Sequence, residues 1–318
     1  MFELTFFGTS SSAPSAQRGL SSHLIMYRQH RFLLDCGEGT QRQILQSGLG
    51  FKRLNKVLLT HSHLDHILGL GGLISTLARW ENLDQIDIYG GRAALHRVHN
   101  LLFKVVFPEK YAPLNINLVP LEPGTIMEDD HFRLSAFPVH HRGPDCFGFL
   151  FEEKATRPFL PEKAEALGVP FGPERSQLVR GEAVTLANGR TIQPGDVLGD
   201  VVPGTRYVHI GDVGRLNNLA DICRDADALV IESTYLSDEG EMASQFGHMT
   251  AARAARFARD MGVKTLILTH LSRRYFERDV RQEARAIFPG AYVARDFDQF
   301  QISRSGVKRK KRNRNGNP

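Results

Sequence analysis

The chain has 318 residues, 42% hydrophobic and 24% charged, a composition typical of a folded globular protein with a sizeable core. The longest apolar runs are too short for a membrane-spanning helix, and the N-terminus opens directly into a strand-like segment, so we expect no signal peptide and no membrane partner. Three widely spaced cysteines favour a reducing, cytoplasmic location over a disulfide-stabilised secreted fold. Much of the net charge of +5 comes from the C-terminus, so we predict a near-neutral domain over residues 1–306 and a basic, disordered tail over 307–318.

The first half of the chain predicts strands that alternate with loops and helices. Apolar runs with β-branched and aromatic residues indicate strands, and apolar residues recurring every three or four positions indicate helices. The predicted strands cover 4–7, 22–27, 31–34, 56–60, 86–89, 117–120 and 132–139, and the predicted helices cover 41–47, 93–103 and a segment beginning at 67.

The densest chemical signal follows the strand at 56–60, where His61, His63, Asp65 and His66 fall within six residues. His61 and His63 are two apart on extended backbone and project to the same side. Asp65 and His66 stand at the start of the next helix and can face a second centre. A polar turn with histidines bonded only to backbone is the simpler alternative, but folding alone does not require this density of metal-binding side chains. The segment therefore predicts a turn that serves two metal ions.

Two other strand ends in the first half carry candidate residues. Asp35 follows the strand at 31–34 and is either an ordinary turn residue or a carboxylate that orients a metal-bound histidine. His140 and His141 follow the strand at 132–139, and only one can face the site because neighbours on a strand point in opposite directions.

The second half of the chain repeats this pattern. Asp212 comes just after the predicted strand at 207–210, Glu232 after that at 229–231, and His270 after that at 265–268. His248 precedes a predicted helix for which Thr250 is the expected N-cap. Open α/β sheets place their sites at the carboxyl ends of strands, so we expect one convergent site. His61, His63 and His141 can supply one metal, Asp65, His66 and His270 a second, and Asp212 can bridge them. Imidazole and carboxylate ligands suit zinc, with manganese or iron as lesser options.

Residues 154–203 differ from the rest because they hold few large apolar side chains and many glycines and prolines. Asn188-Gly189 between two strand-like runs predicts a hairpin with a type I′ turn. We interpret the segment as an arm inserted into the catalytic domain, either an ordinary surface insertion or an exosite for a large substrate. The basic residues that favour the exosite are Lys154, Arg157, Lys163, Arg175, Arg180 and Arg190.

The motif His61-Ser62-His63-Leu64-Asp65-His66 resembles the signature of the metallo-β-lactamase superfamily. Other segments resemble motifs of one family within it, ribonuclease Z, short form, over roughly residues 1–300. The matching segments are 34–41, His141 with 147–149, Gly211-Asp212, Thr269-His270 with Ser272, Arg274 and Tyr275, and the arm at 168–199. Two positions differ: Ile231 precedes Glu232 where the family often has His, and Met249 follows His248 where Ser is usual.

The resemblance implies an αββα sandwich, two zinc ions per subunit and a homodimer whose arm grips the precursor tRNA bound by the other subunit. It implies an endoribonuclease that removes tRNA 3′ trailers and leaves a 3′-hydroxyl. It agrees with the ligand set above, favours His141 over His140, and gives catalytic roles to Asp65, Glu232 and His248. Arg180 and Arg274 are the expected substrate contacts.

Two other readings remain open. The first is a small-molecule hydrolase that acts on a phosphodiester, sulfate ester or lactone, because many chemistries share one fold. The second is a non-catalytic RNA-binding protein with structural zinc, which the open, cysteine-free ligand set disfavours. The basic arm separates the first of these from a tRNA enzyme, since a small substrate has no use for it.

Overall fold

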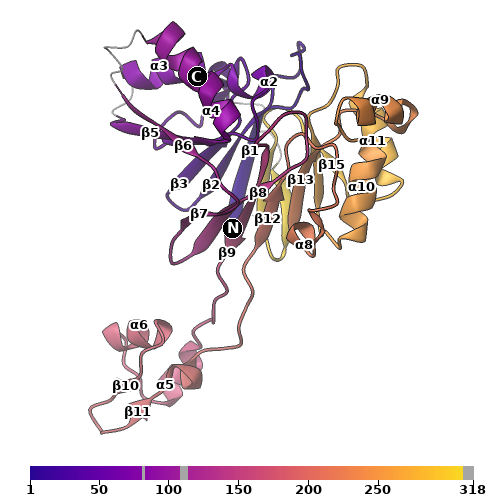
Figure 1. The fold of residues 1–318 in the computed structure, drawn as a ribbon. Helices are drawn as coiled ribbons and strands as arrows, with labels where there is room; N and C mark the ends of the chain where they lie inside the picture. The colour runs from indigo at the N-terminus through magenta and orange to yellow at the C-terminus, as the bar shows by residue number, and fades with distance from the viewer. Residues whose placement is uncertain (81–82, 108–113, 311–318) are drawn as a thin grey trace. The chain divides into compact units, whose positions relative to one another are not determined.

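Two β-sheets dominate the computed structural model, which describes residues 1–80, 83–107 and 114–310 (Figure 1). The first sheet contains, from edge to edge, β17 (Gly306–Lys310), β16 (Gln299–Ser303), β1 (Phe2–Gly8), β2 (Ser22–Tyr27), β3 (His30–Leu34), β4 (Lys56–Leu58), β5 (Gln85–Gly90) and β6 (Asn115–Pro120). The second contains β15 (Tyr292–Val293), β14 (Leu266–Thr269), β13 (Ala228–Glu232), β12 (Arg206–His209), β9 (Phe147–Glu153), β8 (Phe132–Pro138) and β7 (Gly124–Glu128).

The inner faces of the two sheets share an aromatic core. Phe2 of β1 meets Phe151 of β9 edge-on, with ring centroids 5.9 Å apart, and Phe151 stacks on Tyr207 of β12 at 5.5 Å. All three rings are fully buried. Burial of such large apolar side chains contributes about 1.5–3 kcal/mol each, so this layer is a major source of stability.

Helices cover the outer faces of both sheets (Figure 1). Beside the first sheet lie α1 (Thr40–Gln46), α2 (Leu64–Ile67), α3 (Leu70–Trp80), α4 (Arg92–Asn100) and the π-helical turn η1 (Leu101–Val106). Beside the second lie α8 (Ala220–Cys223), the 3₁₀ turn η2 (Ser237–Glu239), α9 (Gly240–Gln245), α10 (Ala251–Asp260) and α11 (Glu277–Arg285). The expected αββα sandwich is therefore confirmed.

The strands and helices that approach the site form for local reasons. Every residue of β13 is buried, as expected for a central parallel strand between β12 and β14. Helix α10 turns an alanine-rich face to the sheet, and the predicted N-cap is confirmed because Thr250 accepts a hydrogen bond from the Arg253 amide. Within the described ranges, no helix is both long and apolar enough to cross a membrane.

Some sequence expectations were wrong in detail. The helix expected from residue 67 is divided into α2 and α3, so Asp65 and His66 lie within a helical turn. The helix expected at 93–103 ends at Asn100 and continues as the π-helical turn η1. Strands β7, β15 and β16 and helix α11 were not predicted; they are short, from two residues in β15 to nine in α11.

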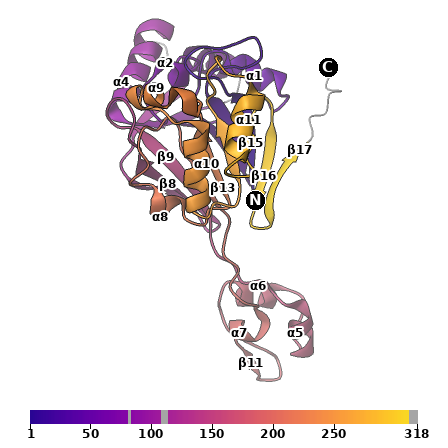
Figure 2. The ribbon, with the colours of Figure 1, turned by 90° about the vertical axis from the view of Figure 1, so that its right-hand side faces the viewer.

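The predicted disorder from residue 307 is also wrong at its start. Residues Gly306–Lys310 form β17, which pairs antiparallel with β16 (Figure 2). Arg309 forms an ion pair with Asp298, just before β16, at 2.6 Å, and Lys310 forms one with Glu3 of β1 at 3.1 Å, so these side chains also hold the segment. The rest of the predicted tail, 311–318, lies outside the described residues.

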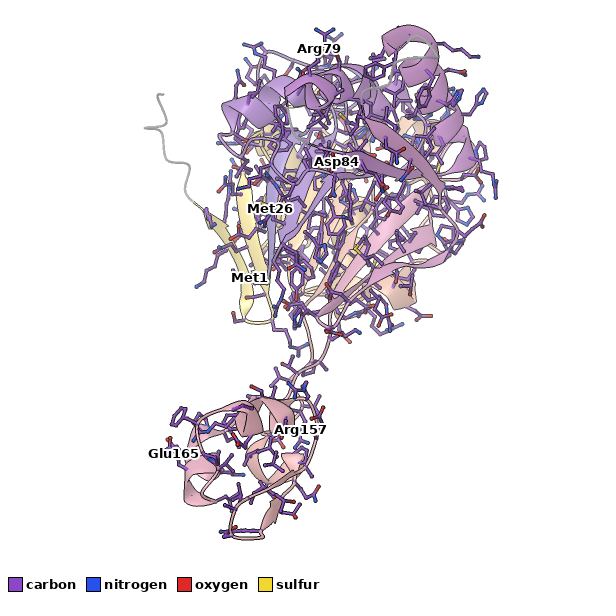
Figure 3. The ribbon with its side chains drawn as sticks, turned by 90° about the vertical axis from the view of Figure 1, so that its left-hand side faces the viewer. Met1, Met26, Arg79, Asp84, Arg157 and Glu165 are labelled. Atoms are coloured by element: carbon purple, nitrogen blue, oxygen red, sulfur yellow. The ribbon has the colours of Figure 1, made fainter. Side chains whose placement is uncertain are left out.

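Residues Glu153–Gly204 form a separate compact unit, hereafter the arm, which includes Arg157 and Glu165 in Figure 3. It contains α5 (Pro161–Ala166), α6 (Pro173–Val179), β10 (Val184–Thr185), β11 (Thr191–Ile192) and α7 (Pro194–Val197). The apolar residues of its own small core are Ala164, Val169, Leu178, Val184, Ile192 and Val197. The predicted hairpin is present, but the type I′ turn is wrong: Gly189 has a positive φ of 82° and Asn188 does not.

Candidate metal centre

The structure brings the seven predicted ligands to one place, at the ends of strands from both sheets. His61, His63, Asp65 and His66 come from the segment after β4, His141 follows β8, Asp212 follows β12 and His270 follows β14. One group contains His61, His63, His141 and Asp212, and a second contains Asp65, His66 and His270. Within each group, one ligand atom from every residue lies within 4.8 Å of the others.

Asp212 stands between the two groups. Its Oδ2 lies 3.6 Å from His61 Nε2 and 3.7 Å from His141 Nε2. Its Oδ1 lies 3.5 Å from His66 Nε2 and 3.3 Å from His270 Nε2. Each carboxylate oxygen therefore faces a different group, which is the arrangement that a carboxylate bridging two cations needs.

The donor set fits metal ions better than it fits a hydrogen-bond network. Oδ1 of Asp212 is buried and has no hydrogen-bond partner among the described residues, which is costly unless a cation or solvent compensates. Nε2 of His66 and Nε2 of His270 face each other at 3.4 Å, and Asp212 Oδ1 lies 3.3 Å from the His270 atom and 3.5 Å from the His66 atom. Imidazoles that converge with carboxylates in this way are a donor set for zinc or a similar transition metal.

In three of the candidate ligand histidines, the ring nitrogen that points away from the cluster contacts a group outside the cluster. His66 Nδ1 lies 2.7 Å from Asp35 Oδ2, and His141 Nδ1 lies 2.7 Å from the carbonyl oxygen of Gly247. His270 Nδ1 lies 2.9 Å from Thr234 Oγ1. Such contacts fix the ring orientation and the tautomer of a metal-binding histidine. Asp35 therefore occupies the position expected of an orienting carboxylate.

Opposite charges stabilise the buried acids of the cluster. Burial disfavours the Asp212 carboxylate, but His270, His66 and His61 surround it and hold its pKa well below the usual range. Burial likewise opposes ionisation of Asp65, while His66 and His270 lower its pKa. Both side chains are therefore anionic at neutral pH, the form that binds cations.

Glu232 and His248 form a pair at the edge of the cluster. Glu232 is fully buried at the end of β13, and its Oε1 lies 2.9 Å from His248 Nδ1. Oε1 also accepts the Val213 amide, and Oε2 accepts the Thr234 hydroxyl. Burial opposes protonation of His248, but the Glu232 charge and hydrogen bond outweigh it and raise the pKa of His248 to about 9. The ring can therefore carry a proton at neutral pH.

Two more histidines, His23 and His209, lie behind the cluster. Their ring centroids are 4.4 Å apart, and they line a small cavity of about 20 Å³ together with Asp35, His66 and Asp212. Burial lowers the pKa of His23 to about 3, so this ring is neutral in the folded protein. Neither residue was predicted from the sequence, since each lies inside a predicted strand, 22–27 or 207–210, rather than after it.

The remaining candidates lie elsewhere. His140 is exposed and belongs to neither ligand group, whereas its neighbour His141 faces the cluster. Arg274 donates a hydrogen bond to Glu239 Oε1 at 2.8 Å and is about half exposed. Arg180 belongs to the arm, where it forms an exposed ion pair with Glu182.

One contact to the cluster was missed from the sequence. The backbone amide of Ser12, in the loop after β1, donates a hydrogen bond to Asp65 Oδ2 at 2.8 Å. The same loop pairs with the residue after His270, because Ser11 N bonds to Leu271 O at 3.0 Å. In the sequence this loop is marked only by its small residues, and these do not indicate that its backbone would contact Asp65, 53 positions further along the chain.

The two sheets, their outer helices and the His/Asp cluster at the strand ends define a protein with the metallo-β-lactamase fold. Residues 169–271 match a β-lactamase superfamily domain, and residues 2–157 match the model of the anti-Pycsar protein Apyc1. The structure of human tRNase Z, short form, superposes with a TM-score of 0.67 at 24% identity, covering 94% of this chain and 99% of that one.

Curated relatives are more specific. Ribonuclease Z of Bradyrhizobium diazoefficiens is 44% identical over 302 residues, which cover 95% of this chain and all of the relative. Ribonuclease Z of Methanothermobacter thermautotrophicus is 38% identical over 303 residues, covering 95% and 97%. This chain belongs to the ribonuclease Z family.

Proposed function

We propose that this chain is a two-zinc endoribonuclease that removes the 3′ trailer from precursor tRNA and leaves a 3′-hydroxyl on the tRNA. Membership of the ribonuclease Z family supports the RNA substrate. The observation that carries the metal assignment is the position of Asp212, with one carboxylate oxygen toward each ligand group. His61, His63 and His141 would hold one ion, Asp65, His66 and His270 the other, with Asp212 shared.

Two such ions would supply a nucleophilic hydroxide at neutral pH and neutralise charge on the phosphodiester. Asp65 is the residue that accepts a proton from the attacking water. The Ser12 amide holds one of its oxygens, so the carboxylate cannot rotate freely. Negative charge that develops on the phosphate oxygens in the transition state would then meet groups that are already fixed in position, the condition under which electrostatic stabilisation is most effective.

His248 is the proposed general acid. Its Nδ1 is occupied by Glu232, so Nε2 is the atom that donates a proton to the 3′-oxygen as the bond from phosphorus to that oxygen breaks. The product oxygen becomes the 3′-hydroxyl of the tRNA, and the phosphate stays on the trailer. Glu232 keeps the imidazole charged before the step and oriented during it.

The arm is the proposed exosite for the body of the tRNA. Arg157 and Arg175 donate to backbone carbonyl oxygens, and neither forms an ion pair within the part of the chain that the structure describes. The ring of Phe171 is 84% exposed and the Arg175 guanidinium lies 3.6 Å from its centroid. Cationic groups beside an exposed aromatic ring suit a nucleic acid, and Arg180 belongs to the same surface. Arg274 would contact the RNA near the catalytic centre.

The proposal includes a homodimer in the cytoplasm, in which the arm of one subunit reaches the tRNA of the other. The three free cysteines are buried, and burial raises the pKa of Cys36, Cys146 and Cys223, which suits a reducing compartment. Sedimentation of the purified chain, alone and with tRNA, tests the assembly.

The deciding experiment pairs metal analysis of the purified protein with mapping of its cut on a 3′-extended tRNA transcript. We expect about two zinc ions per chain and a single cut that leaves a 3′-hydroxyl. Asp65→Ala should abolish cleavage, and activity within tenfold of the wild type would reject its role. Efficient hydrolysis of bis-p-nitrophenyl phosphate without cleavage of the tRNA would instead favour the small-molecule hydrolase.

A further inference from the structure

An aromatic ring and an arginine stand at the rim of the metal centre and have no role in the mechanism above. Phe246 lies two residues before His248, and its side chain is 37% exposed. Arg142 follows His141, and its guanidinium lies 5.5 Å from the centroid of the Phe246 ring. Phe246 and Arg142 are therefore each within two residues of a side chain of the site, His248 or His141.

The backbone around Phe246 is rigid. The Phe246 amide bonds to Met242 O at 2.9 Å and the His248 amide to Ala243 O at 2.8 Å. Gly247 has a φ of +68° and its carbonyl oxygen accepts from His141. A Cβ at Gly247 would lie 3.1 Å from Arg142 Cγ, so the absence of a side chain there lets Arg142 pass over this turn. An exposed ring on such a fixed backbone loses little entropy when a ligand stacks on it.

The charge of Arg142 is also available. Among the described residues, its guanidinium forms no ion pair and donates no hydrogen bond. Another surface pair, Phe276 and Arg278, shows the contrast: the ring is 69% exposed, the guanidinium lies 5.1 Å from it, but Arg278 is neutralised by Asp279 at 3.1 Å. A ring beside an unpaired cation offers a face for a base and a charge for a phosphate.

We propose that Phe246 and Arg142 form a nucleobase platform for the nucleotide whose 3′-oxygen is the leaving group. This inference rests on the proposed function, because His248 must lie beside that oxygen to protonate it. The sugar that carries the oxygen is then close to the turn that bears Phe246, and its base is the group that stacks on the ring. Stacking of this kind accepts any base, so the platform positions the cut without reading sequence.

The test combines protein variants with a substrate that lacks the base. Phe246→Ala should lower kcat/KM about tenfold on a 3′-extended tRNA, since stacking on an aromatic side chain contributes about 1–3 kcal/mol per base. Phe246→Trp should stay within about twofold of the wild type. With an abasic ribose at the nucleotide 5′ to the cut, the wild type should be slower by about the same factor, and Phe246→Ala should cause no further loss.

Three results would overturn the platform: no loss in Phe246→Ala, an equal proportional loss on the intact and abasic substrates, or disappearance of the loss only when the base 3′ to the cut is removed. Phe276→Ala is the matched control and should cleave as the wild type does; a similar loss there would also count against the platform. Cleavage at the trailer junction by the wild type tests the proposed function separately. Failure of the platform would therefore be seen in the Phe246 variants, and failure of the proposed function in the wild type.

Discussion

Asp35 Oδ2 lies 2.7 Å from His66 Nδ1, and the two residues occupy the ends of adjacent strand-to-helix connections. The same carboxylate accepts the amide and the hydroxyl of Thr60, each at 2.8 Å. Asp35 itself has a positive φ of 53°, a conformation that costs energy for a residue with a side chain. The backbone at the end of β3 and the two bonds from Thr60 therefore hold the Asp35 carboxylate against Nδ1 of His66, the ring nitrogen that faces away from the cluster.

Asp35→Asn should weaken metal binding without removing a ligand. Asparagine has one acceptor oxygen where aspartate has two, and its NH₂ group would face either the Thr60 amide or the Thr60 hydroxyl and His66 Nδ1. The tautomer of the His66 ring is then no longer fixed. We expect about 10–100-fold lower metal affinity, measured by competition with a chelating dye. Glu38→Gln, a nearby exposed change, serves as the control. Unchanged affinity in Asp35→Asn would mean that His66 needs no orienting partner.

His248→Ala should affect substrates according to their leaving groups. A ribose 3′-oxygen needs a proton as it leaves, whereas p-nitrophenolate leaves as a stabilised anion. We expect tRNA cleavage to fall about 10²–10⁴-fold and hydrolysis of bis-p-nitrophenyl phosphate to fall much less. The metal content should match that of the wild type. Equal losses on both substrates would remove His248 from the role of general acid.

Replacing residues 153–204 by a short linker should separate tRNA binding from chemistry. The ends of the arm are adjacent, because Thr156 pairs with Val202 and a Cβ at Gly204 would lie 1.8 Å from the Glu153 carbonyl oxygen. The arm also has its own apolar core, and none of its described residues belongs to the cores of the main domain. We expect a much higher KM for tRNA with hydrolysis of bis-p-nitrophenyl phosphate within about twofold. Parallel loss of both activities would show that the arm is not an exosite.

His23 should make the protein less stable in mild acid. Its folded pKa of about 3 lies below the usual value of about 6.5, so the unfolded chain binds the proton more readily. The contribution of His23 is fully present above about pH 6.5 and is lost as the pH falls toward 3. By pH 5 the loss is about 2 kcal/mol. In denaturant titrations, the free energy of unfolding of the wild type should therefore fall by about 2 kcal/mol more than that of His23→Leu between pH 7 and pH 5, and an equal pH dependence in the two proteins would contradict this.

The fold and the convergence of the candidate ligands could be predicted because both depend on local pattern. Buried strands are visible as apolar runs, and residues such as Asp212 and His270 come directly after them. Asp35 apart, the groups that orient the histidines and Asp65 could not be predicted, since they depend on contacts between segments far apart in the chain. Thr234 holding His270 and the Ser12 amide holding Asp65 are examples. The π-helical turn after α4 carries the same apolar period as an ordinary helix, so the sequence does not distinguish them.

The C-terminal strand has a consequence for solubility. β17 is the outermost strand of its sheet, and Lys308, Arg309 and Lys310 on it are exposed. Charged side chains on an edge strand, lysine above all, hinder its pairing with the edge of another molecule even where some of them form ion pairs within the chain. Shortening the chain before Gly306 would expose the edge of β16, which carries no charged side chain, so the charged residues of β17 protect the protein from edge-to-edge aggregation.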